Sequence, residues 1–249
     1  MRALLLFLLL ISTSHALVSI APVDIGAKPG FSGNLSGSVS GKSGNTEKEE
    51  YALGGRLQYD EGSRYVAWGV VTYEYGTSEG VKNEDKTYAH LRYIRTLRDG
   101  EWCGELFVQT EQDSFRDIND RSLGGAGVRW RFFDSKAWGK GYAGLGAFLE
   151  HVSYSRATPD PDENNRRLNS YVAYTKSFMA ASKVSYIGYY QPRFGEYEDF
   201  VTSQNLELIV PVYGKLNLSL TFTYGYDSCP PSGVEKRDTA YRTALFWEF

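Results

Sequence analysis

The chain of 249 residues lacks the features that mark several common classes of protein. Its 2 cysteines are too few for a disulfide scaffold. Its formal net charge of −3 gives none of the basic excess typical of nucleic-acid binders, so no nucleic-acid partner is expected. Beyond the first residues, no apolar run is long enough for a transmembrane helix, and no segment shows helical periodicity. The 15% of aromatic residues, in turn, excludes a disordered chain.

The first 16 residues have the layout of a secretory signal peptide. Arg2 precedes an apolar run from Ala3 to Ile11, and the small-residue end Ser14-His15-Ala16 predicts cleavage after Ala16. A membrane-anchoring helix is the alternative interpretation, but the apolar run is too short to cross a bilayer comfortably. We therefore expect export of a single domain, residues 17–249.

The exported part alternates between apolar and polar residues with period two. One example is Leu216, Leu218, Leu220, Phe222 and Tyr224, between which lie polar or small residues. Successive side chains of a strand face opposite sides of a sheet, so this pattern predicts strands. About twelve are expected, at 30–42, 48–60, 63–76, 85–97, 100–113, 120–133, 139–155, 166–178, 182–193, 199–212, 215–227 and 236–249. Such lengths suit tilted strands that cross a membrane.

The connections between these strands fall into two alternating sets. Short turns are expected at 60–63, 98–100, 134–137, 179–182 and 213–214. Longer polar loops are expected at 76–84, 114–120, 156–165 and 227–235, with shorter members of the same set at 41–46 and 194–198. Bacterial outer-membrane barrels have short periplasmic turns and longer outer loops. The fold predicted is all-β, an antiparallel up-and-down transmembrane β-barrel in the outer membrane of a Gram-negative bacterium, surrounded by outer-membrane lipids.

The last strand supplies a separate signal. Tyr241, Thr243, Leu245, Trp247 and Phe249 alternate with more polar positions, and the final residue is aromatic. A terminal strand that ends in Phe resembles the signature which barrels present to their insertion machinery. The pattern also predicts that Trp247 and Phe249 lie in the periplasmic aromatic girdle.

If the apolar set faces lipid, the alternate set faces the lumen. The residues expected in the lumen include Arg56, His90, Arg92, Glu105, Gln109, Glu111, Arg129, Arg131, Glu150 and Arg242. Two interpretations stay open: a salt-bridged interior that packs the barrel, or the charged lining of a small-solute pore. The lipid face of strand 63–76 is ambiguous, because Val66, Trp68 and Val70 alternate with Ala67, Gly69 and Val71.

Three blocks of sequence carry a family resemblance. They are Phe31-Ser-Gly-Asn-Leu35 followed by Ser43–Thr46, Phe115–Arg121 before the glycines Gly124–Gly127, and Pro230-Pro231 with Arg237–Arg242. In these blocks the chain resembles the YdiY-like salt-induced outer membrane protein family. The resemblance implies an outer-membrane barrel of undefined activity, with no catalytic residues to carry over.

One pair of residues suggests chemistry. His151 and Ser153 share the predicted lipid face of strand 139–155 near its outer end, where an imidazole could activate a hydroxyl. Outer-membrane lipid hydrolases use a similar His-x-Ser pair, although here Tyr154-Ser155 replaces their following Asn-Gly. Only Asn164 has the parity to orient the imidazole. The alternative interpretation is a polar pair at the membrane interface.

The remaining candidates are weaker. The acidic loop Asp160–Asn165 lacks the spacing of a known calcium loop. His90 and His151 have no nearby cysteine partner, so no zinc motif or other metal site is expected, and no cofactor fingerprint is present. Cys103 and Cys229 are predicted at opposite ends of the barrel, too far apart for a disulfide.

Three functions follow from the sequence. The first is a non-enzymatic outer-membrane barrel with a structural or passive small-solute role. The second is a lipid hydrolase that uses His151 and Ser153. The third is a soluble periplasmic β-barrel that binds a ligand.

Overall fold

The structure is a computed structural model that describes residues 22–42, 48–97, 100–114, 116–154, 161–179 and 182–249. The predicted signal peptide at 1–16 lies outside the described residues. So do Ser43–Thr46 and Phe115 of the family blocks, and Asp160 of the acidic loop.

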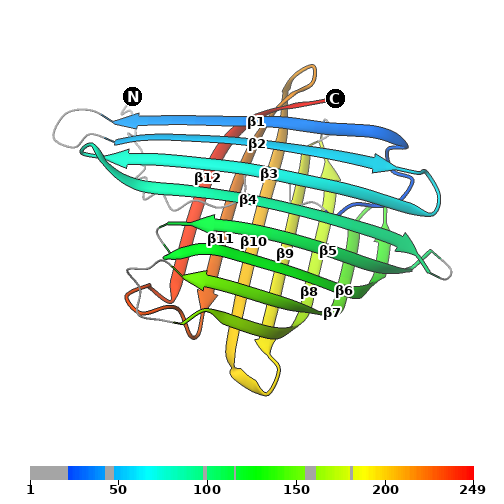
Figure 1. The fold of residues 1–249 in the computed structure, drawn as a ribbon. Coiled ribbons are helices and arrows are strands. Elements are labelled where there is room, and N and C mark those ends of the chain that lie inside the picture. Colours follow the sequence, from blue (N-terminus) through cyan, green and yellow to red (C-terminus); the bar gives the residue numbers. More distant parts are fainter. Residues whose placement is uncertain (1–21, 43–47, 98–99, 115, 155–160, 180–181) are drawn as a thin grey trace, which may run out of the picture.

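The described residues form twelve strands that close into one antiparallel barrel (Figure 1). The strands are β1 (Gly30–Lys42), β2 (Lys48–Asp60), β3 (Tyr65–Ser78), β4 (Val81–Thr96), β5 (Trp102–Asp113), β6 (Ile118–Ser135), β7 (Gly139–Tyr154), β8 (Glu163–Phe178), β9 (Ser182–Arg193), β10 (Glu196–Tyr213), β11 (Leu216–Asp227) and β12 (Arg237–Glu248). Each strand pairs with the next in the chain, and β12 returns to pair with β1. The predicted fold is confirmed. No described helix is both long and apolar enough to cross a membrane.

Side chains alternate between the two faces of the barrel wall. On β7, Leu145 and Leu149 are exposed on the outside, whereas Phe148 and Glu150 are buried inside. The ambiguous strand β3 has its inward set at Val66 and Val70. The same parity carries Glu74 inside, where its carboxylate pairs with Arg242 at 2.7 Å.

One predicted loop is wrong. Residues 76–84 do not form a long loop, because β3 and β4 continue to a tight turn at Glu79-Gly80, where both residues have positive φ (52° and 74°). Polar residues in this hairpin can face water, so the loss of apolar alternation there does not end the strands. The longest described connection, 228–236, lies at the same end of the barrel.

The barrel closes at a short seam. Only Asn34–Gly37 of β1 pair with Leu245–Glu248 of β12 within the described ladder, whereas β1 and β2 pair over thirteen positions. Phe249 extends the seam, since its backbone exchanges two 2.9 Å hydrogen bonds with Gly33. A Cβ atom at Gly33 would come within 2.8 Å of the Phe249 ring, so glycine leaves room for the terminal aromatic side chain.

Candidate functional site

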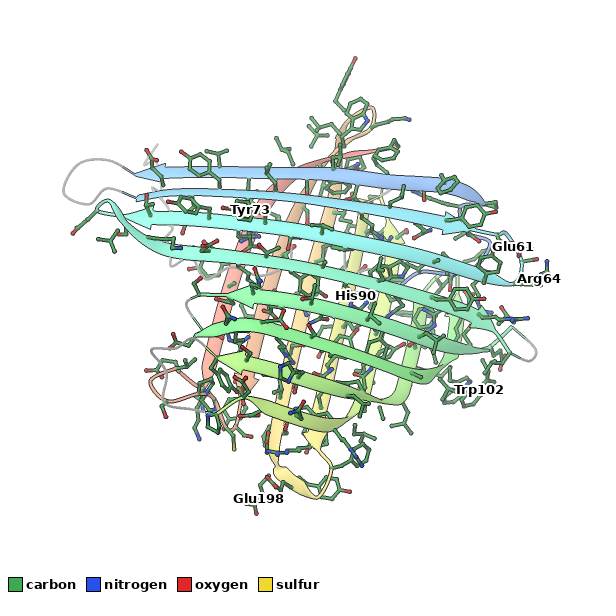
Figure 2. The ribbon with its side chains drawn as sticks, viewed as in Figure 1. Glu61, Arg64, Tyr73, His90, Trp102 and Glu198 are labelled. Carbon is green, nitrogen blue, oxygen red and sulfur yellow. The ribbon has the colours of Figure 1, made fainter. Side chains whose placement is uncertain are left out.

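The candidate site is the lumen, and the side chains that line it differ from one end of the barrel to the other. One end carries the β2–β3 turn and the chain termini of the barrel, and is called the turn end. The other carries the β7–β8 and β11–β12 connections, and is called the loop end. In Figure 2, Glu61 and Arg64 mark the turn end and Glu198 marks the loop end, with His90 between them.

Residues 22–29 form an N-terminal strap inside the turn end. The backbone N–H groups of Gly26 and Lys28 donate to the Asp60 carboxylate at 2.9–3.2 Å. Val23 and Ile25 pack on a buried cluster of Val66, Ile94 and Cys103. The strap therefore lies over the inner faces of β3, β4 and β5.

Asp24 attaches the strap to β6 and β7, on another part of the wall. Its carboxylate accepts hydrogen bonds from Lys140 Nζ at 2.5 Å and Tyr142 Oη at 2.6 Å, and Arg131 Nη1 lies 3.9 Å away. Burial favours the neutral acid, but the hydrogen bonds from Lys140 and Tyr142 outweigh it and lower the pKa of Asp24. The strap thus spans the turn end of the lumen from β2 to β7.

Above the strap lies a group of six side chains that we call the aromatic–arginine site: Arg56, Trp68, His90, Arg92, Phe107 and Tyr171. The guanidinium carbons of Arg56 and Arg92 lie 4.4 and 5.8 Å from the centroid of the Trp68 ring. The Arg92 guanidinium also lies over the rings of Phe107 and Tyr171, at 5.3 and 6.0 Å. Cations over aromatic faces are attracted by the ring quadrupole, so these contacts hold two like charges near each other.

The Tyr171 ring depends on a glycine beside it. A Cβ atom at Gly144 would lie 2.0 Å from a carbon of this ring, so only glycine at this position admits the ring. The Tyr171 hydroxyl donates to Glu105 Oε2 at 2.7 Å, and Arg129 Nε lies 3.7 Å from the other Glu105 oxygen.

Towards the loop end, the interior is a network of ion pairs that we call the ion-pair network. Its members alternate in sign around the barrel wall from β4 to β10. The salt bridges run Lys86–Glu111 (2.7 Å), Glu111–Arg121 (3.4 Å), Arg121–Glu150 (2.6 Å), Glu150–Arg167 (3.0 Å) and Arg167–Asp199 (2.9 Å). Arg242 of β12 also reaches Glu74 of β3 at 2.7 Å, past the two strands that separate them in the wall.

A cavity of about 330 Å³ connects these levels. At the loop end it is lined by Arg116, Asp227 and Asp238, and at the turn end by Pro22 and Val23 of the strap. The aromatic–arginine site lines its middle. The interior therefore combines both sequence interpretations, a packed ionic network and a charged cavity.

The structure places the charged residues predicted for the lumen as follows. Arg56, Arg92, Glu111 and Arg129 line the cavity. Glu105 and Glu150 are buried in the ion pairs described above, and Arg242 bonds Glu74. Arg131 lies at the turn end beside Asp24 and Asp134.

Sequence reasoning did not single out Lys86, Arg121, Arg167 and Asp199, although their positions in the strands share the inward parity. It also missed the strap, which has no periodicity. The only local signal for the strap is one acid between two apolar residues, Val23 and Ile25.

The predicted pair His151 and Ser153 lies on the outer face of β7, on the same side as exposed Leu149. Asn164 of β8 is directly opposite His151 in the ladder, and its Oδ1 lies 3.1 Å from His151 Nδ1. A carboxamide oxygen only accepts, so Nδ1 is the donor and Nε2 keeps its lone pair. The orienting residue that parity allowed is therefore in contact with the imidazole.

The structure also describes the two cysteines and part of the acidic loop. Cys103 is buried and Cys229 is exposed, and both are free. Asn165 donates to Glu163 at 2.7 Å within β8. Among the described residues, no three His, Cys, Asp or Glu side chains gather as a metal site would require.

Comparison with known proteins identifies the family. Residues 36–249 match the family described as "Protein of unknown function, DUF481". The chain belongs to the DUF481 family. No curated protein sequence matches it.

Solved structures similar to this DUF481 chain are barrels. The NanC porin superposes with a TM-score of 0.52 and 13% identity, over 87% of this chain and 98% of the porin. The KdgM porin gives a TM-score of 0.44 and 11% identity, over 88% and 99%. The translocator domain of the autotransporter NalP from Neisseria meningitidis gives a TM-score of 0.42 and 8% identity, over 88% of this chain and 86% of that domain. At 13% identity the likeness to the NanC porin concerns the fold alone, which is that of an outer-membrane barrel.

Proposed function

We propose that this DUF481 barrel resides in the outer membrane and admits small hydrophilic solutes to its lumen. The observation that carries the proposal is the continuous cavity of about 330 Å³ from the loop end to the strap. The exposed apolar side chains of the wall, such as Leu145 and Leu149, supply a lipid-facing surface. The cavity limits solutes to small molecules, and displacement of the strap would complete the passage.

The test is the conductance of the refolded mature chain in a planar lipid bilayer. Discrete steps that reproduce between preparations are the expected result. The proposal would be contradicted by a refolded barrel that gives no conductance steps and that lets no small sugar enter liposomes in a swelling assay.

Location and export belong to the same proposal. We expect cleavage of the signal peptide after Ala16, recognition of the strand that ends in Phe249 by the barrel-insertion machinery, and a YdiY-like, salt-induced role within DUF481. Cell fractionation distinguishes this from a soluble periplasmic ligand binder. The barrel should pellet with membranes and require detergent for extraction, whereas a soluble protein would stay in the periplasmic fraction.

A second candidate function, hydrolysis of lipid esters, is favoured by the contact between His151 and Asn164. The Nδ1–H tautomer leaves Nε2 free to take the proton of Ser153 Oγ as that oxygen attacks an ester carbonyl. The imidazolium would then protonate the departing alcohol, and water would release the fatty acid from the acyl-enzyme. Support also comes from Leu149, an exposed apolar residue on the same face of the strand as this pair.

This candidate is tested by fatty-acid release from phospholipid vesicles that contain the refolded protein. Ser153→Ala should abolish release. Ser170→Ala, a matched change of another outward serine, whose hydroxyl donates to the Tyr190 carbonyl, should leave it intact. Equal release by wild type and Ser153→Ala would exclude the pair as a catalytic site.

A further inference from the structure

The aromatic–arginine site combines positive charge with an aromatic surface in the middle of the cavity. Arg56 and Arg92 both lie against the Trp68 ring, and all three side chains line the cavity. A small anion that enters here would meet two guanidinium groups. Guanidinium groups bind carboxylates through short, charge-assisted hydrogen bonds, often in pairs.

Three buried polar atoms of this site lack hydrogen-bond partners within the described part of the chain. They are Trp68 Nε1, His90 Nε2 and Arg92 Nε. Buried polar groups in folded proteins almost always find a partner, so unpaired atoms that surround a cavity indicate a place for a polar ligand or for water. Trp68 and Arg92 offer donors to that ligand.

The third atom, His90 Nε2, is an acceptor. His90 Nδ1 lies 3.3 Å from Gln109 Oε1, which also receives the Tyr88 hydroxyl at 3.1 Å. Because an amide oxygen only accepts, Nδ1 carries the proton and Nε2 does not. A ligand that satisfies this atom must therefore donate, as a hydroxyl group does.

Beside the two arginines, aromatic rings give the site flat apolar surfaces. The Trp68 and His90 rings have centroids 5.0 Å apart, and the Phe107 ring lies 6.4 Å from His90. The aliphatic C–H face of a pyranose ring packs well on such aromatic surfaces, while a few polar groups orient it. A neutral sugar would bring no negative charge to the two guanidinium groups, and a plain fatty acid would leave His90 Nε2 without a donor.

We propose that the aromatic–arginine site binds an acidic sugar, a pyranose ring that carries a carboxylate. The carboxylate pairs with Arg56 and Arg92, a hydroxyl donates to His90 Nε2, and the ring packs against Trp68. The proposal rests on the proposed function, because it names the class of solute that the lumen admits. The strap forms the floor below this site, since Pro22 and Val23 line the same cavity.

The experiment is calorimetric titration of the refolded full barrel in detergent with three probes. D-glucuronate carries ring, hydroxyls and charge, glucose lacks the charge, and cyclohexanecarboxylate lacks the hydroxyls. Saturable binding of glucuronate, at least about tenfold tighter than either of the others, is expected from the loss of one charge-assisted contact or one satisfied buried group. Equal affinity for all three, or no binding of glucuronate, would overturn the proposal.

Two variants locate the binding. Arg92→Gln should weaken the binding of glucuronate by about tenfold or more and leave the affinity for glucose unchanged. His90→Phe keeps an aromatic ring and removes Nε2, so it should reduce the preference for glucuronate over cyclohexanecarboxylate. Arg193→Gln is the matched control, because Arg193 is a charged residue near the loop end that bonds Asp199 and does not line the cavity.

Circular dichroism confirms that each variant is folded before it is titrated. If Arg92→Gln and His90→Phe bind glucuronate as tightly as wild type, the site is wrong. Conductance of the same samples separates this proposal from the proposed function. A barrel that conducts salt but does not bind glucuronate overturns only the acidic-sugar site, whereas one that binds it without conducting supports the site and contradicts passage.

Discussion

The two halves of the lumen handle buried charge in different ways. Near the loop end, carboxylates and cations alternate from Lys86 to Asp199, and each charge of this series has an opposite neighbour within 3.4 Å. Nearer the turn end, Arg56 and Arg92 lie against one indole ring. Burial of charge is costly unless it is paired. The first half therefore pairs its charges with one another, which suits it to holding the wall together, while the second presents Trp68 Nε1, His90 Nε2 and Arg92 Nε to a solute.

The two groups of side chains also line the cavity in different ways. In the ion-pair network, the charged side chains that line it, Lys86, Glu111 and Arg121, bond one another. In the aromatic–arginine site, guanidinium groups stack on rings instead, and three buried polar atoms stay unbonded within the described chain. Changes in the first half should mainly affect stability, and changes in the second half or the strap should mainly affect solutes.

The largest effect is expected from Glu150→Ala in the ion-pair network. Glu150 binds both Arg121 and Arg167, so its removal leaves two buried cations each with one partner fewer. Breaking a buried ion pair costs about 3–5 kcal/mol. Urea unfolding of the refolded barrel in lipid vesicles should show a loss of this order.

Glu196→Ala is the control for that change. Glu196 pairs with Arg193 at 3.5 Å, but its side chain is 65% exposed, so its loss should have little effect. If the two variants unfold at the same urea concentration, the ion-pair network does not stabilise the barrel.

The next effect concerns the strap. Asp24→Asn removes the charge that holds the strap to Lys140 and Arg131, so the strap should leave the turn end more often. The loss of one charge-assisted contact corresponds to about a tenfold change in such an equilibrium. Single-channel records should show more frequent or longer openings. Asp134→Asn is the matched control, because Asp134 contacts the same two cations but is not part of the strap.

Acid should reproduce part of that result in the wild type. The pKa of Asp24 is lowered from its ordinary value of 3.8 when the strap is docked. A lowered pKa in the docked state stabilises docking above the ordinary pKa, and this contribution is lost as pH falls through the lowered value. Conductance should thus stay constant from neutral pH to about pH 4 and rise below it. The rise should be absent in Asp24→Asn, and its persistence there would assign it to another group.

The fold was largely predictable because a barrel wall follows local rules. The predicted strand 48–60 ends at Asp60 as expected, because the turn residues Glu61-Gly62-Ser63 follow its regular alternation. The inward positions of Arg92 and Glu105 follow from parity alone. The 76–84 hairpin was missed because the apolar alternation fades towards its tip, although the ladder continues from Tyr75 and Asp85 to Ser78 and Val81.

The site was less predictable because its contacts join distant parts of the chain. Arg242 and Glu74 are 168 residues apart, and Lys140 and Asp24 are 116 apart. Parity shows that such side chains face inward but not which ones meet, because that depends on the stagger of strands around the closed barrel. His151 and Asn164 could be matched in advance because neighbouring strands bring them into direct register.

The last prediction concerns the smallest effect, the chemical labelling of the two cysteines. This experiment assigns the two ends of the barrel to the two sides of the membrane. Cys229 is exposed in the β11–β12 connection at the loop end, whereas Cys103 is buried under Val23 and Ile25 of the strap. A membrane-impermeant maleimide added to intact cells should label Cys229 and spare Cys103, because thiol modification requires access. Cys229→Ser should abolish the labelling. If Cys229 is labelled only after the cells are lysed, the barrel has the opposite orientation, and a solute would then meet the strap before the ion-pair network.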